Sequence, residues 1–206
     1  MRLYSRYIFP WLCDLVLDRP RVAEHRRTLL ANVGGDVLEV GFGTGLNLPH
    51  YPPQVRRIMA VDPNERMLRK ARKRIERSGI EVDQRRSFGE QKSFDDGAFD
   101  CVISTFTLCS VDDPRRVIRE IHRVLKPGGR FLLLEHGLSP DPNVRKWQRR
   151  LNPLERLLGD GCRLDRDMRA IVASQPFEKI EIENFHLERT PPTHGYLFRG
   201  VATKSR

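Results

Sequence analysis

Three alternate glycines follow directly after a short apolar stretch of the chain. The stretch covers residues 37–40, and a second apolar stretch, residues 57–61, ends at Asp62. The glycines are Gly41, Gly43 and Gly45. Glycine lets a tight turn bring backbone N–H groups close to a ligand, and an acid about 20 residues further on can accept hydrogen bonds from a ribose. The pattern predicts a nucleotide-cofactor site, with an ordinary glycine turn as the alternative.

The spacing of the glycines distinguishes two kinds of cofactor. A dinucleotide fingerprint has the spacing G-x-G-x-x-G, but its last position is Leu46 in this chain. The spacing here is G-x-G-x-G, and Glu39 precedes it. Together with Asp62, this arrangement resembles the class I S-adenosylmethionine (SAM) methyltransferases. The resemblance implies that SAM is the cofactor and that the chain is a methyltransferase.

The resemblance also implies contacts for the matching residues. Glu39 and the three glycines would lie along the methionine part of SAM, with Asn47 near it, and Asp62 would bind the ribose hydroxyls. Pro63 and Met67 would lie beside the adenine, although Met67 also fits plain core packing.

Two further contacts follow from the same resemblance. Gly89 and Glu90 align with the segment that hydrogen-bonds the adenine edge, but Ser87 and Phe88 before them depart from the common acidic-Ala-Glu version. Thr105 would end a strand under the sulfonium, and a purely structural strand end is the alternative.

Three later segments follow in the order that the same class shows. Residues 93–104 indicate a polar turn and then a buried strand. Residues 117–125 have helical apolar periodicity, and the Pro-Gly-Gly run at 127–129 predicts the end of that helix. Another apolar strand, residues 131–134, leads into Glu135 and His136.

The length and composition favour one domain. The chain has 206 residues, of which 39% are hydrophobic, which suits a single core and leaves no room for a dehydrogenase-sized substrate domain. Residues 177–187 and 194–204 predict two strands without a helix between them, hence an antiparallel hairpin. The expected fold is α/β and Rossmann-like, the class I methyltransferase fold, with a seven-stranded mostly parallel sheet, a C-terminal antiparallel hairpin and helices on both faces.

We expect four parts within residues 1–206: an N-terminal helical cap (1–33), a SAM-binding core (35–136), a substrate-recognition insertion (137–175) and a terminal strand hairpin (176–206).

The apolar run 7–17 contains Pro10 and Asp14 and is shorter than the roughly 20 residues of a spanning helix. It lacks a small-residue cleavage site for a signal peptide. We predict a helix that covers the cofactor. Its large apolar side chains, Phe9, Trp11 and Leu12, are expected in the core.

The insertion carries an apolar periodic pattern. Trp147, Leu151, Leu154, Leu157 and Leu158 predict an apolar helical face over the pocket mouth, broken by Pro153. The string W-Q-x-x-L-N-P-L-x-x-L-L-G-D-G-C, which follows the Glu-His pair at 135 and 136, resembles the thiol S-methyltransferases that act on small alkyl thiols. That group has an N-terminal hydrophobic membrane anchor, which the run 7–17 does not match.

His136 and Asp160 are the candidate catalytic residues. A neutral histidine can take a thiol proton, and a thiolate attacks better than a thiol. The alternatives are a histidine bonded to the backbone and an aspartate that closes a turn. Cys109 and Cys162 are expected as buried small hydrophobes. No C-x-x-C or H-x-x-x-H spacing occurs among four Cys and six His, so no metal is predicted.

The charge and the remaining motifs restrict the acceptor. No N-P-P-Y turn or Pro-Cys pair occurs, which argues against methylation of nucleic-acid bases. The formal charge of +10 is scattered over helices without an aromatic platform, so a solvated basic surface is favoured over nucleic-acid binding. Four cysteines without a secretion signal favour the cytoplasm.

The sequence therefore predicts methyl transfer to a small-molecule acceptor, with a thiol preferred. The basic and apolar start keeps peripheral membrane contact open, and with it methylation of a phospholipid amine or a quinone ring. A non-catalytic, SAM-binding, RNA-associated module is the alternative from another class. The oligomeric state is not predicted.

Overall fold

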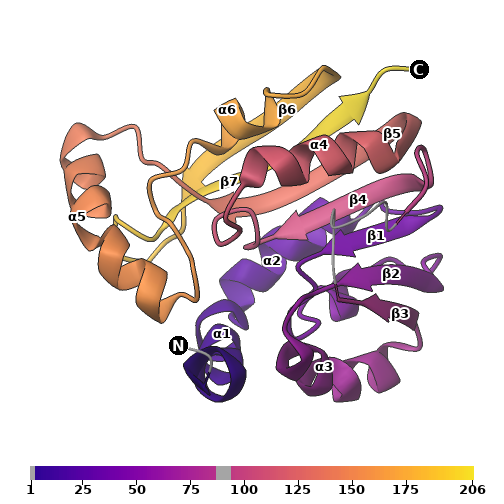
Figure 1. Ribbon diagram of the computed structural model, residues 1–206, viewed down its shortest axis with the longest axis horizontal. Coiled ribbons are helices and arrows are strands. Elements are labelled where there is room, and N and C mark those ends of the chain that lie inside the picture. The colour runs from indigo at the N-terminus through magenta and orange to yellow at the C-terminus, as the bar shows by residue number, and fades with distance from the viewer. Residues whose placement is uncertain (1–2, 87–93) are drawn as a thin grey trace.

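The computed structural model describes residues 3–86 and 94–206 (Figure 1). Within these residues, seven strands form one sheet in the order β3-β2-β1-β4-β5-β7-β6. The strands are β1 Val37–Val40, β2 Arg57–Val61, β3 Glu81–Arg85, β4 Phe99–Thr105, β5 Leu125–His136, β6 Phe177–His186 and β7 Tyr196–Lys204.

Strands β1 to β5 pair in parallel, and β7 lies antiparallel between β5 and β6. The link between β6 and β7 is too short for the crossover that a parallel pair needs, so the two strands form a hairpin. The expected fold class, with its mostly parallel sheet and terminal antiparallel hairpin, is confirmed.

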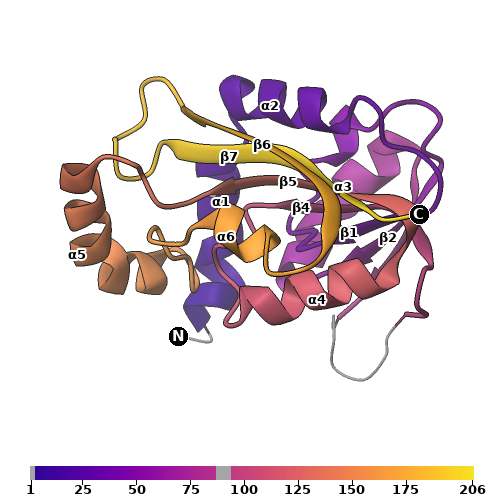
Figure 2. The same cartoon turned by 90° about the horizontal axis from the view of Figure 1, so that it is seen from above.

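Helices cover both faces of the sheet (Figure 2). Helices α2 and α3 lie on one face, and α4 and α6 lie on the other, while α1 and α5 lie beyond the end of the sheet. The helical segments are η1 Tyr4–Ile8 (a π-helical turn), α1 Phe9–Leu17, α2 Pro20–Leu30, η2 Leu48–His50 (a 3-10 turn), α3 Glu65–Ser78, α4 Pro114–Val124, α5 Pro142–Leu158 and α6 Met168–Val172.

The central strands β4 and β5 are largely apolar and buried, because each of their faces meets a helical layer. In β4, Val102 packs with the α4 and α6 side, whereas Cys101 and Ile103 pack with the α2 and α3 side. In β5, Phe131 and Leu132 divide in the same way. The alternation of side chains along a strand thus builds two cores from one sheet.

Several helices begin at a residue whose side chain caps the first turn. Asn64 accepts a hydrogen bond from the Arg66 N–H at the start of α3, and Asp141 does the same for the Asn143 N–H at the start of α5. These caps satisfy backbone donors that the helix itself leaves unpaired. A cap placed just after a strand therefore fixes where the chain turns back along the sheet.

Strand β5 begins earlier than the sequence predicted. Helix α4 ends at Val124, and β5 starts at Leu125, which pairs with Phe99 before the register shifts. The predicted strand covered only residues 131–134. Gly128 has a positive φ of 74°, and this irregularity lets the Pro-Gly-Gly run continue as a strand in place of a loop.

The prediction for the packing of Trp11 is wrong. Its side chain is 72% exposed, and Lys70 Nζ lies 4.1 Å from the ring centroid. Phe9 and Leu12, on another side of α1, line the pocket described below. The core prediction also fails for these two residues, because neither belongs to an apolar core of the described chain. Polar contacts of Asp14 with Lys70 and Arg74 help to hold α1.

The prediction of a break in α5 at Pro153 is wrong, because the helix continues through this residue. The apolar residues Trp147, Leu154 and Leu157 are exposed, and Leu158, at the end of the same face, lines the cavity. The buried residues of α5 are instead Gln148 and Asn152. Proline has no N–H to donate to the carbonyl one turn earlier in the helix. Because Pro153 lies on the exposed side, water can bind that carbonyl, and the helix tolerates the proline.

Polar contacts explain which side of α5 faces inward. Gln148 Oε1 accepts the Ser139 N–H at 3.0 Å, and its Nε2 donates to the carbonyls of Gly137 and Thr193, both at 3.0 Å. Asn152 Oδ1 accepts the Leu164 N–H at 2.8 Å. Buried amides need such partners, so these bonds determine the orientation of α5 and leave its leucines outside.

Within residues 3–86 and 94–206, no helix has both the length and the apolarity to cross a membrane.

Candidate functional site

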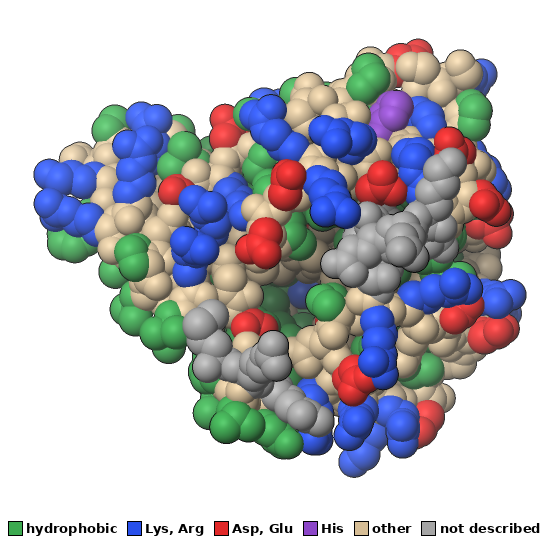
Figure 3. All heavy atoms as spheres, viewed as in Figure 1, with side chains coloured by type: hydrophobic (Ala, Val, Ile, Leu, Met, Phe, Trp, Pro, Cys, Tyr) green, Lys and Arg blue, Asp and Glu red, His purple; other side chains and the backbone are tan. Residues whose placement is uncertain are grey.

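A cavity of about 550 Å³ lies where the carboxyl ends of β1, β2, β4 and β5 meet. Helix α1 and the C-terminal end of α5 complete its walls. A hollow opens near the middle of the face shown in Figure 3, with hydrophobic side chains inside it. Open parallel sheets bind ligands at this edge, and the volume is typical of a small-molecule site.

The glycine turn forms one wall of this cavity. Gly41 and Gly43 have positive φ values of 75° and 57°. A Cβ on Gly41 would lie 1.9 Å from Thr107 Oγ1, so a larger residue does not fit there. Gly45 also has a positive φ, but it packs against Leu48 and Phe42 and does not line the cavity.

Asp62 fixes the shape of this turn. Its Oδ2 accepts the Gly43 N–H at 2.8 Å, and its Oδ1 accepts the Asn64 N–H at 2.8 Å. Burial raises the pKa of Asp62, and the two backbone N–H groups act against that shift. Each carboxylate oxygen keeps a further acceptor site, which suits the hydroxyl groups of a ribose.

Glu39, at the adjacent strand end, is fully enclosed. Its carboxylate accepts hydrogen bonds from Asn47 Nδ2 at 2.9 Å and from the Tyr51 hydroxyl at 2.6 Å. Burial raises the pKa of Glu39 to about 7, although both hydrogen bonds act in the opposite direction. Glu39 and Asn47 both line the cavity, at the same end as Asp62.

Arg26 is a site residue that the sequence reasoning missed. It is buried on α2, and its Nη1 donates to Asn47 Oδ1 at 2.7 Å and to Thr105 Oγ1 at 2.8 Å. Its Nε is buried and has no hydrogen-bond partner among residues 3–86 and 94–206. Arg26 lies on the buried face of α2 together with Val22 and Leu29. An arginine at helical spacing from these apolar residues is the pattern by which the sequence could have indicated it.

The other predicted cofactor residues fall in two groups. Pro63, Met67 and Thr105 line the cavity. Gly89 and Glu90 lie outside the described residues. Met67 is also buried on α3, so its position fits both core packing and a contact with a flat ring.

The far end of the cavity holds a sulfur and imidazole cluster. The ligand atoms of Cys109, His136 and Cys162 all lie within 4.8 Å of one another, and Cys162 Sγ is 3.2 Å from His136 Nε2. Beside the cluster, Glu155 Oε2 lies 3.2 Å from His194 Nε2. The sequence singled out His136 as a candidate catalytic residue and Cys109 and Cys162 as buried small hydrophobes. It did not predict that the three lie together, because they come from separate segments of the chain.

The cluster groups are electrostatically linked. A hydrogen bond from the Cys162 thiol lowers the pKa of Cys109 well below its ordinary value and raises the pKa of Cys162. Burial lowers the pKa of His136, but the Cys109 thiolate outweighs it and raises this pKa to about 9. The ionisation of His136 is therefore linked to that of Cys109.

Asp160 lines the same cavity but has a different setting. It has a positive φ of 49° in the turn after α5, and its carboxylate accepts a hydrogen bond from the Ser5 hydroxyl. Its charge contributes to the raised pKa of Asp62, which places it toward the cofactor end. These contacts suit a residue that joins the N-terminal segment to the cavity wall.

Helix α1 covers the cavity through polar contacts. Asp14 accepts a hydrogen bond from Thr44 Oγ1, and it lies 3.0 Å from Lys70 Nζ and 3.2 Å from Arg74 Nη1. The only buried residue of α1 among those described is Pro10. The helix therefore lies over the glycine turn without being part of either apolar core.

Comparisons with known proteins identify the family. Residues 38–133 match a family model described as a methyltransferase domain. The chain is 32% identical over 203 residues to a phosphatidylethanolamine N-methyltransferase of Cereibacter sphaeroides, a match that covers 96% of this chain and 93% of that protein. The chain belongs to the SAM-dependent methyltransferase family. The alternative of a non-catalytic RNA-associated module is therefore set aside.

Two other similarities concern the acceptor and the fold. The methyltransferase is 36% identical over 167 residues to thiol S-methyltransferase TMT1B of Rattus norvegicus, which covers 78% of this chain and 65% of that protein, less than two thirds of its length. A crystal structure from Thermotoga maritima, titled as a possible histamine N-methyltransferase, has a TM-score of 0.69 at 20% identity, covers 99% of both chains and shows the same fold.

SAM is the methyl donor of this methyltransferase. The cavity fits it, because a Cβ on Gly43 would meet no atom closer than 3.9 Å, which leaves room for a ligand, and Asp62 has acceptor sites for a ribose. The unpartnered Nε of Arg26 points to an anionic ligand group, and we expect it to bind the carboxylate of the methionine part.

Replacing Arg26 with Met should weaken SAM binding roughly 10- to 100-fold, since a lost hydrogen bond to a charged group costs about 1.5–3 kcal/mol. Isothermal titration calorimetry measures the affinity. Arg27→Met is the matched control, because Arg27 is the exposed neighbour on the same helix. Equal affinities of the two variants would contradict a role for Arg26.

Glu39 should make the stability of the free protein depend on pH. Its folded-state pKa of about 7 exceeds the usual 4.5, so the folded chain holds an extra proton between these values. The free energy of unfolding should therefore fall as the pH rises through this range. The charged groups that act on Glu39 are Arg26 and Asp62.

Urea unfolding at several pH values from about 5 to 8 tests this dependence. In Glu39→Gln, the slope of the unfolding free energy against pH should shrink by the equivalent of about one proton. Glu76→Gln, on the exposed side of α3, is the control and should keep the wild-type slope. An unchanged slope in Glu39→Gln would refute the assignment.

Proposed function

We propose that this methyltransferase transfers the methyl group of SAM to the sulfur of a small apolar thiol. Two things support the proposal. The chain is similar to a thiol S-methyltransferase over most of its length. The end of the cavity away from Asp62 has apolar walls. It also contains His136 and Glu155, which are side chains that can accept the proton of a thiol.

The lining of the cavity is the observation that carries this proposal. Leu12, Val16, Phe106, Val111 and Leu158 supply apolar walls. Among the described lining residues, Arg26 is the one arginine or lysine, and it lies at the cofactor end. An acceptor with a phosphate would need a cation at the other end, so the cavity favours a small uncharged molecule.

Bound SAM supplies a methyl carbon that is already activated by positive sulfur. The chain then has to position the acceptor and remove its proton, since a thiolate is the reactive form. His136 and the neighbouring pair of Glu155 and His194 line this end of the cavity and are the groups placed to accept that proton. The apolar walls exclude water from the attacking sulfur.

Formation of S-adenosylhomocysteine in the presence of short alkyl thiols tests the proposal. The wild type should turn over with thiols and not with the matching alcohols. Asp62→Ala should lose turnover together with SAM binding. His136→Gln should lower kcat by about 100-fold or more, the usual contribution of proton transfer.

His186→Gln is the matched control, because His186 is exposed at the end of β6. It should keep wild-type turnover. SAM binding without thiol turnover in the wild type would overturn the thiol proposal and leave the family assignment intact.

A second candidate is the amine of a phospholipid, reached from a membrane surface. Its support is an apolar surface made by the exposed residues of α1 and α5, among them Trp11, Leu15, Trp147, Leu154 and Leu157. Val16 and Leu158 are 53% and 44% exposed and also line the cavity. This surface therefore extends to the cavity mouth.

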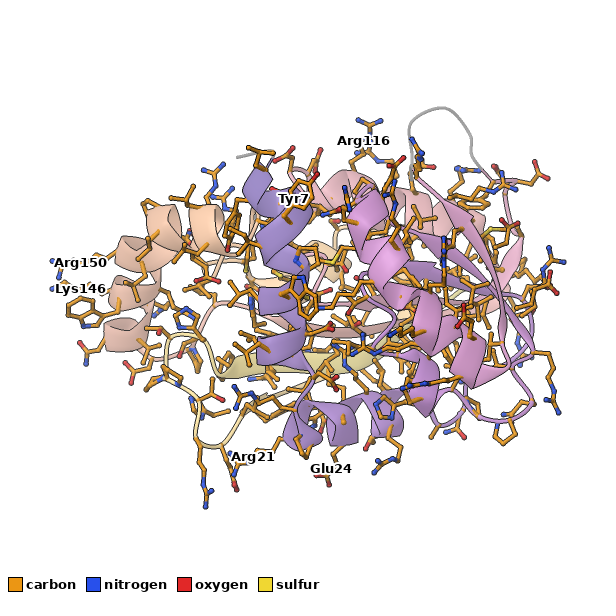
Figure 4. The ribbon with its side chains drawn as sticks, turned by 90° about the horizontal axis from the view of Figure 1, so that it is seen from below. Tyr7, Arg21, Glu24, Arg116, Lys146 and Arg150 are labelled. Atoms are coloured by element: carbon orange, nitrogen blue, oxygen red, sulfur yellow. The ribbon has the colours of Figure 1, made fainter. Side chains whose placement is uncertain are left out.

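The charges around this surface match an anionic bilayer. Lys146 and Arg150 extend outward from α5 (Figure 4), and the guanidinium of Arg150 lies 5.4 Å from the ring centroid of Trp147. Hydrophobic side chains also gather over α1 and α5 along one margin of Figure 3. Exposed apolar helices with basic neighbours are typical of peripheral membrane binding.

Tryptophan fluorescence tests this contact directly, because both tryptophans of the chain, Trp11 and Trp147, are exposed on this surface. Vesicles of phosphatidylcholine with phosphatidylglycerol should shift the emission to shorter wavelength, and pure phosphatidylcholine should not. Trp147→Phe leaves Trp11 as the probe of α1.

Salt and the double variant Lys146→Ser, Arg150→Ser should both reduce the shift. Arg115→Ser, on α4 away from this surface, is the control. An emission maximum that stays constant on adding the anionic vesicles would refute the membrane contact.

A further inference from the structure

We propose that Cys109, His136 and Cys162 bind one Zn²⁺ ion, with a fourth coordination position open to the cavity for the sulfur of the acceptor. The three residues lie on separate segments that converge at the cavity wall. The second part of the proposal, the acceptor sulfur, rests on the proposed thiol function. The first part, the metal, does not.

The geometry suits tetrahedral zinc. The three ligand atoms lie within 4.8 Å of one another, and Cys162 Sγ is 3.2 Å from His136 Nε2. With Zn–S near 2.3 Å and Zn–N near 2.0 Å, tetrahedral ligands are separated by about 3.5–3.8 Å. Small rotations of the side chains would therefore be enough to coordinate the ion.

The ligand set is chemically specific. Two thiolates and one imidazole are soft donors that select zinc over calcium or magnesium. Two thiolates also cancel the charge of the ion, which a buried site requires. Zinc sites with three protein ligands commonly leave the fourth position to a substrate or water.

The backbone around the cluster is held firmly. The Cys109 carbonyl accepts the Arg163 N–H at 2.9 Å, which ties the loop after β4 to the segment that carries Cys162. Arg166 strengthens the same link by donating to the carbonyls of Leu108 and Val111. Ligands held by their supporting contacts need little reorganisation to bind a metal.

Glu155 and His194 lie in the cavity that contains the open position. Glu155 Oε2 is 3.2 Å from His194 Nε2, and both residues line the cavity. In the proposed reaction, the proton of a thiol that occupies the open position passes to this pair. The sulfur of that thiol then forms a bond to the methyl carbon while the donor bond breaks, and the electron pair stays on the donor sulfur.

Metal analysis of the untagged protein tests the site. Zinc should be present at about one ion per chain. The variants Cys109→Ser and Cys162→Ser should lose most of it while keeping the wild-type circular dichroism. Cys13→Ser and Cys101→Ser should keep it, because these cysteines lie outside the cluster.

Cobalt(II) provides the second measurement. Zinc-free protein with added cobalt should show the intense visible bands of a tetrahedral site and thiolate-to-metal charge transfer. Addition of a small alkyl thiol should change these bands, since it occupies the fourth position. The matching alcohol should leave the bands unchanged.

The outcomes separate the two parts of the proposal. A wild type without zinc that also fails to bind cobalt would overturn the metal site, and so would a Cys109–Cys162 disulfide found by mass spectrometry. If cobalt binds but its visible bands do not change when a thiol is added, the proposal that the acceptor sulfur binds the metal would be overturned. Zinc binding without thiol turnover would support the metal site and count against the thiol function alone.

Discussion

The buried carboxylate of Glu135 is the contact on which the site depends. It accepts hydrogen bonds from Ser104 Oγ at 2.9 Å and from the backbone N–H groups of Thr107 and Leu108 at 2.9 and 3.0 Å. An enclosed carboxylate needs such donors, so the loop after β4 must close around it. Cys109 follows that loop and His136 follows Glu135, which explains why the two meet.

Glu39 repeats this arrangement on the other side of β4. It organises the cofactor end through Asn47 and Tyr51, just as Glu135 organises the acceptor end through the loop after β4. Strand β4 lies between β1 and β5, so Thr105, at its end, separates the two halves of the cavity. The charged half suits the cofactor, and the apolar half suits the molecule that receives the methyl group.

The sequence predicted features that are carried by residues close together along the chain. The glycine turn, the strands and the hairpin belong to this kind, since local spacing determines them. The sequence could not predict that Cys109, His136 and Cys162 lie close together, because only the folded sheet brings these distant segments into contact. The exposed face of α5 was missed for a related reason. Periodicity defines an apolar face, but Gln148 and Asn152 decide which side turns inward.

The attachment of α1 bears on how the used cofactor leaves. This helix covers the glycine turn, and Asp14 holds it to Lys70 and Arg74 while neither apolar core includes it. Detaching it breaks ion pairs that water can replace, without exposing the sheet. We therefore expect that release of S-adenosylhomocysteine costs little of the stability of the domain and that its rate depends on ionic strength.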